Sequence, residues 1–200
     1  MKTMKTLACI TGIVLPDSVK VIGKGAFCGC QNLAEISIPE SVSEIGNDAF
    51  TQTAFLSNNR NEQFLIRNGI LLYSKAVSGE IVVPDGVTCI NPEAFSYNYE
   101  DFSVVLPESV SCLKRGAFHS CTPSSITIMN PDCEIYDAAL TISYGHAEYV
   151  FSFPVFNGVI RGYAGSAAEA YAKKFSRPFE VIGGRSTAAA RGSGAGNRRL

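Results

Sequence analysis

The 200-residue chain is long enough for one or two domains, and a content of 46% hydrophobic and 18% charged residues suffices for an ordinary folded core. A formal net charge of −1 argues against a nucleic-acid surface, which needs clustered lysine and arginine. No apolar run reaches the roughly 18 residues of a membrane-spanning helix, so we expect no membrane insertion.

One short sequence pattern occurs four times along the chain. The copies are IVLPDSVKVIGKGAF, ISIPESVSEIGNDAF, IVVPDGVTCINPEAF and VVLPESVSCLKRGAF, which begin at residues 13, 36, 81 and 104. Their prolines are spaced 23, 45 and 23 residues apart, so the middle interval holds one repeat and an insert of 22 residues. A fixed period in this range is typical of a stacked repeat array.

Each copy predicts one rung of such an array. The short β-branched run predicts a strand whose first and third side chains point inward and whose second points outward. Proline ends the strand because it has no N–H group, and the acidic and small residues after it turn the chain. We expect rungs near residues 13–35, 36–53, 81–103, 104–125 and 126–135, the last carried by the run ITI.

The second half of each rung is predicted to close it against the opposite wall. A valine and an isoleucine or leucine point back inward after the turn. Gly23 and Gly46 suit a tight bend with positive φ, Asn91 tolerates such a bend, and Lys114 departs from the pattern. The Ala-Phe pair then ends the rung, and we expect one stacked column of Phe27, Phe50, Phe95 and Phe118.

The remaining segments predict an insert, a cap and a tail. We expect residues 54–80 to loop out between the second and third rungs, with Asn68-Gly69 as the turn of a hairpin. Ser166 and Glu169 form a capping box before a run of helix formers, so residues 136–182 are expected to form a helical C-terminal cap. Residues 183–200 lack aromatic residues and are expected to be disordered.

The seven cysteines contain no C-x-x-C motif and indicate no zinc site. Cys30 and Cys121 follow the repeat phenylalanine by three residues and are interpreted as buried apolar fillers. Cys89 and Cys112 occupy the same position of adjacent rungs, so we expect them to be lateral neighbours that stay free thiols.

One acidic residue follows the proline of every copy. A ladder of cation ligands is one interpretation of this column, since hard cations prefer clustered oxygen ligands. The favoured interpretation is a set of exposed turn residues, because calcium sites usually draw several ligands from one loop. We therefore predict neither a metal nor a cofactor; the column consists of Asp17, Glu40, Asp85 and Glu108.

The joint pattern I-x-I-P-x-S-V-x-x-I-G-x-x-A-F-x-x-C resembles the BspA-type leucine-rich repeat over residues 13–50, 81–121 and 126–135. The resemblance implies a β-dominated leucine-rich-repeat solenoid of the α/β horseshoe class, spanning residues 1–182 with about five parallel-stranded rungs of about 23 residues. It also implies a module of an extracellular or cell-surface protein that serves adhesion or protein binding, with no catalytic residues.

Three functions follow as hypotheses: a protein-binding module, a structural spacer within a larger surface protein, and a hydrolase with an unrecognised site. Neither His119 nor His146 has visible partners for catalysis. A spacer should carry uniformly polar outward positions, whereas three outward valines favour binding to another protein. The predicted binding surface is centred on Val82 and Val105. It comprises Val14, Glu35, Ser37, Glu80, Val82, Ser103, Val105, Ser125 and Thr127.

Residues 1–12 have the pattern of the end of a rung, but no strand or proline precedes them. The strand that begins at Ile13 would then be an unpaired edge, and such edges invite pairing with other chains. We therefore expect either that the chain is a fragment of a longer protein or that it self-associates through its N-terminal edge.

Overall fold

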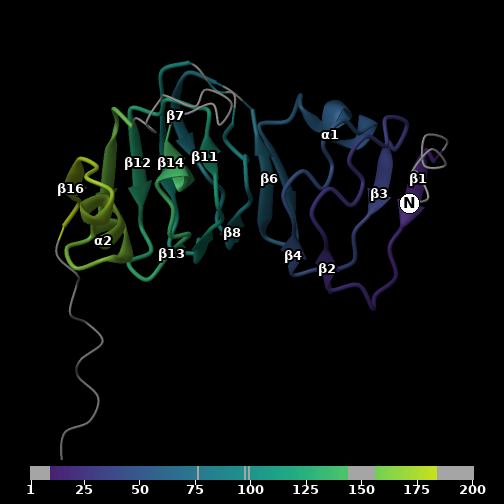
Figure 1. The fold of residues 1–200 in the computed structure, drawn as a ribbon, viewed down its shortest axis with the longest axis horizontal. Helices are drawn as coiled ribbons and strands as arrows, with labels where there is room; N and C mark the ends of the chain where they lie inside the picture. The colour runs from purple at the N-terminus through teal and green to yellow at the C-terminus, as the bar shows by residue number, and fades with distance from the viewer. Residues whose placement is uncertain (1–9, 76, 97, 99, 144–155, 184–200) are drawn as a thin grey trace, which may run out of the picture.

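A computed structural model describes residues 10–75, 77–96, 98, 100–143 and 156–183. Its rungs stack along the longest axis, with the first strand near one end and the last strand and helix at the other (Figure 1). Residues 1–9 and the predicted tail, apart from Gly183, lie outside the described residues. The predicted β-dominated solenoid of stacked rungs is confirmed.

The first wall of the solenoid contains seven short strands. They are β1 (Gly12–Val14), β3 (Glu35–Ser37), β7 (Gly79–Val82), β9 (Phe102–Leu106), β12 (Ser125–Ile128), β15 (Val159–Gly162) and β16 (Phe179–Val181). β1 pairs with β3 in parallel, and the other five form one parallel sheet in the order β7-β9-β12-β15-β16. The array is thus longer than the expected five rungs, because β15 and β16 continue the sheet from within the predicted cap.

Side chains alternate along these strands as predicted. In β7, Ile81 is fully buried and Val82 is 55% exposed. In β9, Val104 and Leu106 are fully buried, while Val105 between them faces outward and is half-buried. The burial of alternate residues requires neighbouring rungs on both sides, because a three-residue strand has too little surface to enclose its own apolar side chains.

The second wall contains the short strands after each turn together with the insert. Its strands are β2 (Val21–Ile22), β4 (Glu44–Ile45), β5 (Phe64–Arg67), β6 (Ile70–Ser74), β8 (Cys89–Ile90), β10 (Cys112–Leu113) and β13 (Glu134–Ile135). β2 pairs with β4, and the others form a sheet in the order β13-β10-β8-β6-β5.

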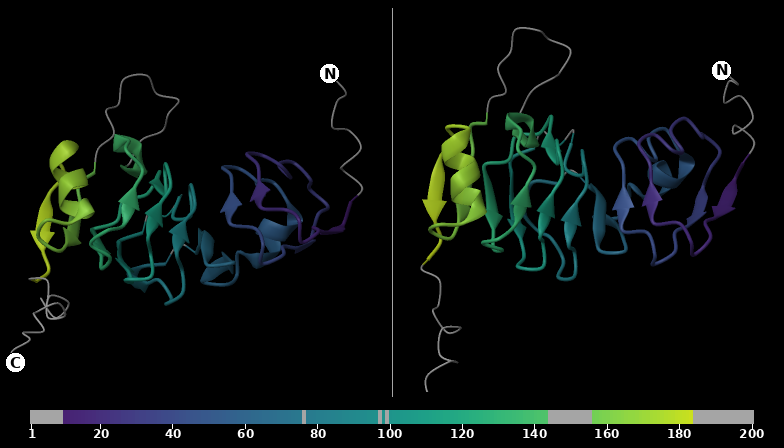
Figure 2. Two further views of the ribbon diagram at one scale, coloured as in Figure 1. Left: turned by 90° about the horizontal axis from the view of Figure 1, so that it is seen from below. Right: turned by 60° about the horizontal axis from the view of Figure 1, so that its bottom comes forward.

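The insert forms the predicted hairpin, but it does not loop out of the array. β5 and β6 pair antiparallel around Asn68 and Gly69, which have φ values of 51° and 72°. β6 also pairs in parallel with β8, so the hairpin takes a place in the second wall. The side-chain amide of Asn68 donates to the carbonyls of Pro39 and Val42, at 2.7 and 3.0 Å, which attaches the hairpin to the second rung. Figure 2 shows this blue segment between the purple and green parts of the array.

The third wall contains the Ala-Phe segments, with β11 (Phe118–His119) and β14 (Ile142–Ser143) near its C-terminal end. The expected column of four phenylalanines is two separate stacks. Phe27 lies parallel to Phe50 at 5.8 Å between ring centroids, and Phe95 lies parallel to Phe118 at 4.7 Å. The insert interrupts the column, and Phe50 meets the edge of Phe55 from helix α1 (Ala54–Asn59) instead.

The prediction that Gly23 and Gly46 adopt positive φ is wrong, because the residues with positive φ lie two positions later in the repeat. The left-handed residues are Gly25, Asp48, Glu93 and Gly116, with φ between 59° and 72°. Gly46 is instead a close-packing residue, since a Cβ atom there would lie 2.5 Å from the backbone nitrogen of Lys24 in the preceding rung.

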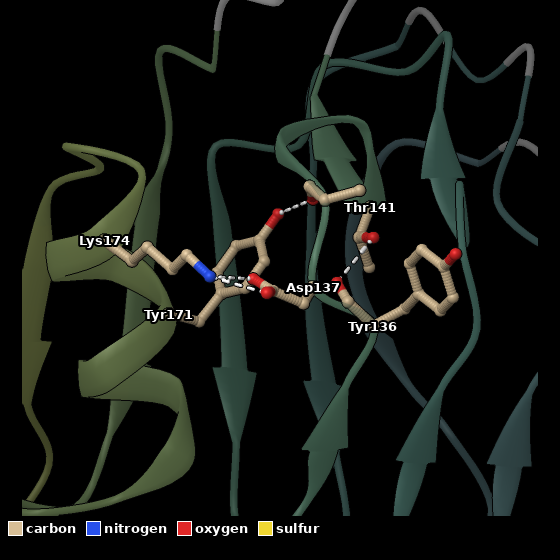
Figure 3. Close-up of polar contacts among 6 residues, drawn as sticks. Tyr136, Asp137, Thr141, Tyr171 and Lys174 are labelled. Atoms are coloured by element: carbon tan, nitrogen blue, oxygen red, sulfur yellow. Dashed lines mark hydrogen bonds and ion pairs between the residues drawn. The ribbon is translucent and has the colours of Figure 1, made fainter.

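The C-terminal cap is held to the array by helix α2 (Ala167–Lys174), whose bounds agree with the sequence pattern. Ser166 caps the helix, its hydroxyl accepting from the Glu169 N–H at 3.2 Å. The Tyr171 hydroxyl donates to the Ala138 carbonyl and accepts from the Ile142 N–H, at 2.8 and 3.2 Å. Figure 3 shows Tyr171 and Lys174 reaching toward the segment 136–141, which includes the 3-10 helix η2 (Ala139–Thr141).

We predict that Gly46→Ala lowers the free energy of unfolding by about 1–3 kcal/mol, because the added methyl group must displace the neighbouring backbone. Gly23→Ala is the matched control. It occupies the same repeat position, but a methyl group added there would have no atom within 4 Å, so a change under about 0.5 kcal/mol is expected. Urea titrations followed by circular dichroism measure both. Equal destabilisation by the two substitutions would contradict the close-contact explanation.

Candidate binding surface

The outward column of the main first-wall sheet lies in register across its five strands. Val82 pairs with Val105, Val105 with Thr127, and Thr127 with Arg161 of β15. Arg161 in turn pairs with Glu180 of β16. The structure therefore brings together the predicted centre of the surface and places two charged residues beside it.

Arg161 and Glu180 were not predicted from the sequence. Their side chains form an ion pair at 2.8 Å and remain 40% and 57% exposed. Their strands lack the proline and the 23-residue spacing of the repeats, so the repeat pattern gives no signal for them. The sequence VIRG at 159–162 shows no apolar–polar alternation of its own; the outward position of Arg161 is seen only in the burial pattern of the folded strand.

The predicted residues Glu80, Ser103 and Ser125 form a second column beside the outward one, and only part of this column is exposed to a partner. Glu80 is exposed and Ser103 is half-buried, and the two are register neighbours on β7 and β9. Ser125 lies next to Ser103 but is only 4% exposed. Its hydroxyl accepts a hydrogen bond from the Arg161 guanidinium at 3.1 Å, so Arg161 covers this position.

Val14, Glu35 and Ser37 lie apart from the other predicted residues, on the two-stranded sheet of β1 and β3. Together with Phe55 and Arg67 of the insert they line a shallow hollow of about 580 Å³. Val14 is 78% exposed. The insert thus divides the nine predicted residues into two patches, an N-terminal one and a larger one on β7, β9 and β12.

The outer edge of β1 has no paired strand among the described residues. Val21, on the neighbouring wall of the same rung, is 54% exposed. The first rung therefore presents apolar side chains and unpaired backbone at the end of the described array.

The acidic turn column is exposed at all four positions, as the favoured interpretation expects. Nowhere in the described ranges do three or more His, Cys, Asp or Glu side chains gather as they would around a metal ion. None of the helices in the same ranges is long and apolar enough to cross a membrane.

The Nδ1 atom of His119 lies at hydrogen-bond distance, 3.2 Å, from the Ser120 hydroxyl. A serine nucleophile must reach its substrate, whereas Ser120 is 1% exposed. This pair therefore does not supply a nucleophile and base. His146, the other histidine considered, lies outside the described residues.

Cys89 and Cys112 are register neighbours on β8 and β10, as predicted, and both are free thiols. The Cys89 thiol donates to the Cys112 sulfur at 2.9 Å. This hydrogen bond, together with the nearby Lys114 ammonium, lowers the pKa of Cys112 to about 7 despite partial burial. The same hydrogen bond and burial raise the pKa of Cys89, so Cys112 loses its proton first.

Comparison with known proteins identifies the repeat. The sequence model of the family described as "BspA type Leucine rich repeat region (6 copies)" matches residues 4–69 and 66–148, which is more than half of the chain. No curated protein matches significantly. The crystal structure of the pneumococcal vaccine antigen PcpA is similar at 15% identity, with 86% of this chain and 68% of that chain covered and a TM-score of 0.28. A TM-score this low does not establish a common overall shape.

We predict that alkylation of Cys112 by iodoacetamide accelerates as the pH rises through about 7, because the thiolate is the reactive form. Cys89 should stay largely unmodified over the same range. Cys89→Ala removes the hydrogen bond that stabilises the thiolate and should shift the Cys112 profile to higher pH. Peptide mass mapping without reductant measures the modification at each cysteine. Equal modification of both cysteines at pH 7, or a disulfide between them, would contradict this assignment.

Proposed function

Because the chain belongs to the BspA type leucine-rich repeat family, we propose that it is a non-catalytic module that binds another protein through the first-wall face of β7, β9 and β12. The observation that carries the proposal is the register pairing of Val82 with Val105 on the outward side of the sheet. Val82 is 55% exposed on β7, the edge strand of this sheet, so its apolar side chain is open to contact with a partner. Placement of the module in a surface or secreted protein is part of the proposal and is supported by the family resemblance.

The spacer hypothesis is less well supported. A spacer needs uniformly polar outward positions so that neighbouring surfaces do not adhere. Here Val14 and Val82 are both more than half exposed. The charged pair of Arg161 and Glu180 adds a polar border to the apolar centre, which is the usual arrangement at protein interfaces.

We predict that Val82→Glu combined with Val105→Lys reduces partner binding by about tenfold or more, since loss of a central apolar contact costs about 1–2 kcal/mol or more. Opposite charges are chosen because like charges on paired positions destabilise a sheet. Pull-down from bacterial and host surface extracts, followed by titration of the captured protein, measures the loss.

Val21→Glu is the control for this experiment, because Val21 is equally exposed but belongs to the second wall. It should leave binding unchanged. Binding that survives the double substitution would transfer the site to the hairpin of β5 and β6, and no specific capture at all would favour the spacer.

The outer edge of β1 supports self-association as a second proposal. An exposed strand edge with an apolar neighbour such as Val14 pairs readily with other chains. Light scattering should then show a mass that rises with protein concentration, and Val14→Lys should reduce the rise, since an edge lysine opposes strand pairing. A constant monomer mass at all concentrations would contradict this second proposal.

A further inference from the structure

The backbone ladder of the third wall is interrupted beside the insert. Between the first two rungs, alternate N–H groups of one Ala-Phe segment donate to carbonyls of the next. These bonds run from Gly25 to Asn47, from Phe27 to Ala49 and from Gly29 to Thr51, at 2.9, 2.8 and 2.9 Å. The N–H groups at the same positions of the second rung belong to Asp48, Phe50 and Gln52. None of these three has a hydrogen-bond partner among the described residues.

A cavity of about 450 Å³ separates these donors from the third rung, and we call it the slot. The hairpin occupies part of the space, since the Ser74 N–H donates to the Ala94 carbonyl at 2.7 Å. On the same side, Ser96 lines the slot; it is 7% exposed and its hydroxyl has no hydrogen-bond partner in the described structure. The slot thus presents backbone donors on one side and a buried hydroxyl on the other.

Two carboxylates line the slot from opposite sides, Asp48 on the second rung and Glu93 on the third. They occupy the same repeat position, and neither takes part in an ion pair within the described residues. Both side chains stay exposed at the rim of the slot; partial burial, and then the charge of Asp48, raise the pKa of Glu93, while the charge of His119 lowers it. Arg60 also lines the slot, but its guanidinium lies over the Tyr73 ring, 5.6 Å from the centroid.

We propose that the slot binds a peptide segment of a partner protein that follows the backbone path of a rung and carries a basic residue immediately before a glycine. Carbonyls of the peptide accept from the N–H groups of Asp48, Phe50 and Gln52, as the next rung does elsewhere in the third wall. The basic side chain lies between the carboxylates of Asp48 and Glu93. This is strand addition of the kind by which peptides extend an open backbone ladder.

The chain itself contains a segment with this chemistry, residues 114–120, of sequence KRGAFHS. In the structure its Gly116 and Ala117 carbonyls accept from the N–H groups of Glu93 and Phe95, at 3.0 and 3.1 Å. Gly116 has a φ of 72°, which suits the left-handed position. A peptide of this sequence can therefore present to Asp48 and Phe50 the carbonyls that it presents to the third rung within the fold.

The test uses the full chain and the acetylated, amidated peptide KRGAFHS labelled with a fluorophore. Fluorescence anisotropy should show saturable binding that weakens as salt is added, because the basic residues meet the carboxylates. The peptide QQGAFHS is the matched control and should bind about five-fold more weakly or worse. Asp48→Asn keeps a residue that tolerates positive φ; combined with Glu93→Gln it should weaken KRGAFHS by about five-fold or more.

A steric variant tests the location. Ser57→Trp places a large side chain on a residue of α1 that lines the slot and should abolish binding, whereas Asn58→Trp on the same helix should not. The Val82 and Val105 substitutions should leave peptide binding intact, which separates this site from the proposed first-wall face. Absence of saturable binding, or binding insensitive to both Ser57→Trp and the paired carboxamide variant, would overturn the proposal. A dimer of the protein that dissociates in these same variants would make the occupant a second copy of the chain and would likewise overturn it.

Discussion

Lateral contact between equivalent positions of neighbouring rungs is the interaction on which this structure depends. Ile81, Val104, Ile126 and Ile160 lie in register across four strands, and each is fully buried. None of these strands could bury its isoleucine or valine alone, because each is only four or five residues long. A rung contacts little beyond its immediate neighbours, so the array tolerates variation in sequence only where the stacked positions stay apolar and of similar size.

The insert shows what happens where this repetition is broken. The apolar core divides there into two clusters, with Ile70 of β6 in the first and Leu71 in the second. β6 continues the backbone ladder of the C-terminal part through its pairing with β8. Toward the N-terminal part, the hairpin is attached through side-chain packing and through the Asn68 amide. In the second wall, backbone pairing therefore continues from the insert toward the C-terminal rungs through β6 and β8. In the first and third walls, the pairing between rungs is interrupted at the insert.

The features predicted most reliably from the sequence are those with a clear local pattern. Strand positions, their inward and outward residues, the Asn68-Gly69 hairpin and helix α2 all follow from local patterns, and they agree with the structure. The strands β15 and β16 were not predicted, because they lack the proline and the regular spacing of the repeat. Without them, Arg161 could not be placed beside Ser125, and Ser125 was therefore assigned to an open surface that it does not have. The predicted position of the left-handed residues was also wrong. Glycine is required at 46 by close contact with the preceding rung and not by a positive φ.

The left-handed position distinguishes the rungs beside the insert from the others. Glycine occupies it at 25 and 116, where it costs little, but Asp48 and Glu93 occupy it on the two sides of the insert. An L-residue in this conformation costs about 1 kcal/mol; the short Asp48 carboxylate offsets part of this by accepting from the Thr51 hydroxyl at 3.4 Å, whereas the longer Glu93 is less suited to it. Partial burial, and then repulsion from the Asp48 carboxylate, raise the pKa of Glu93. Stacking alone would favour glycine at both sites. Two acidic residues occupy this position on the two sides of the open ladder, and the proposed binding of a basic peptide rests on the charge that they supply there.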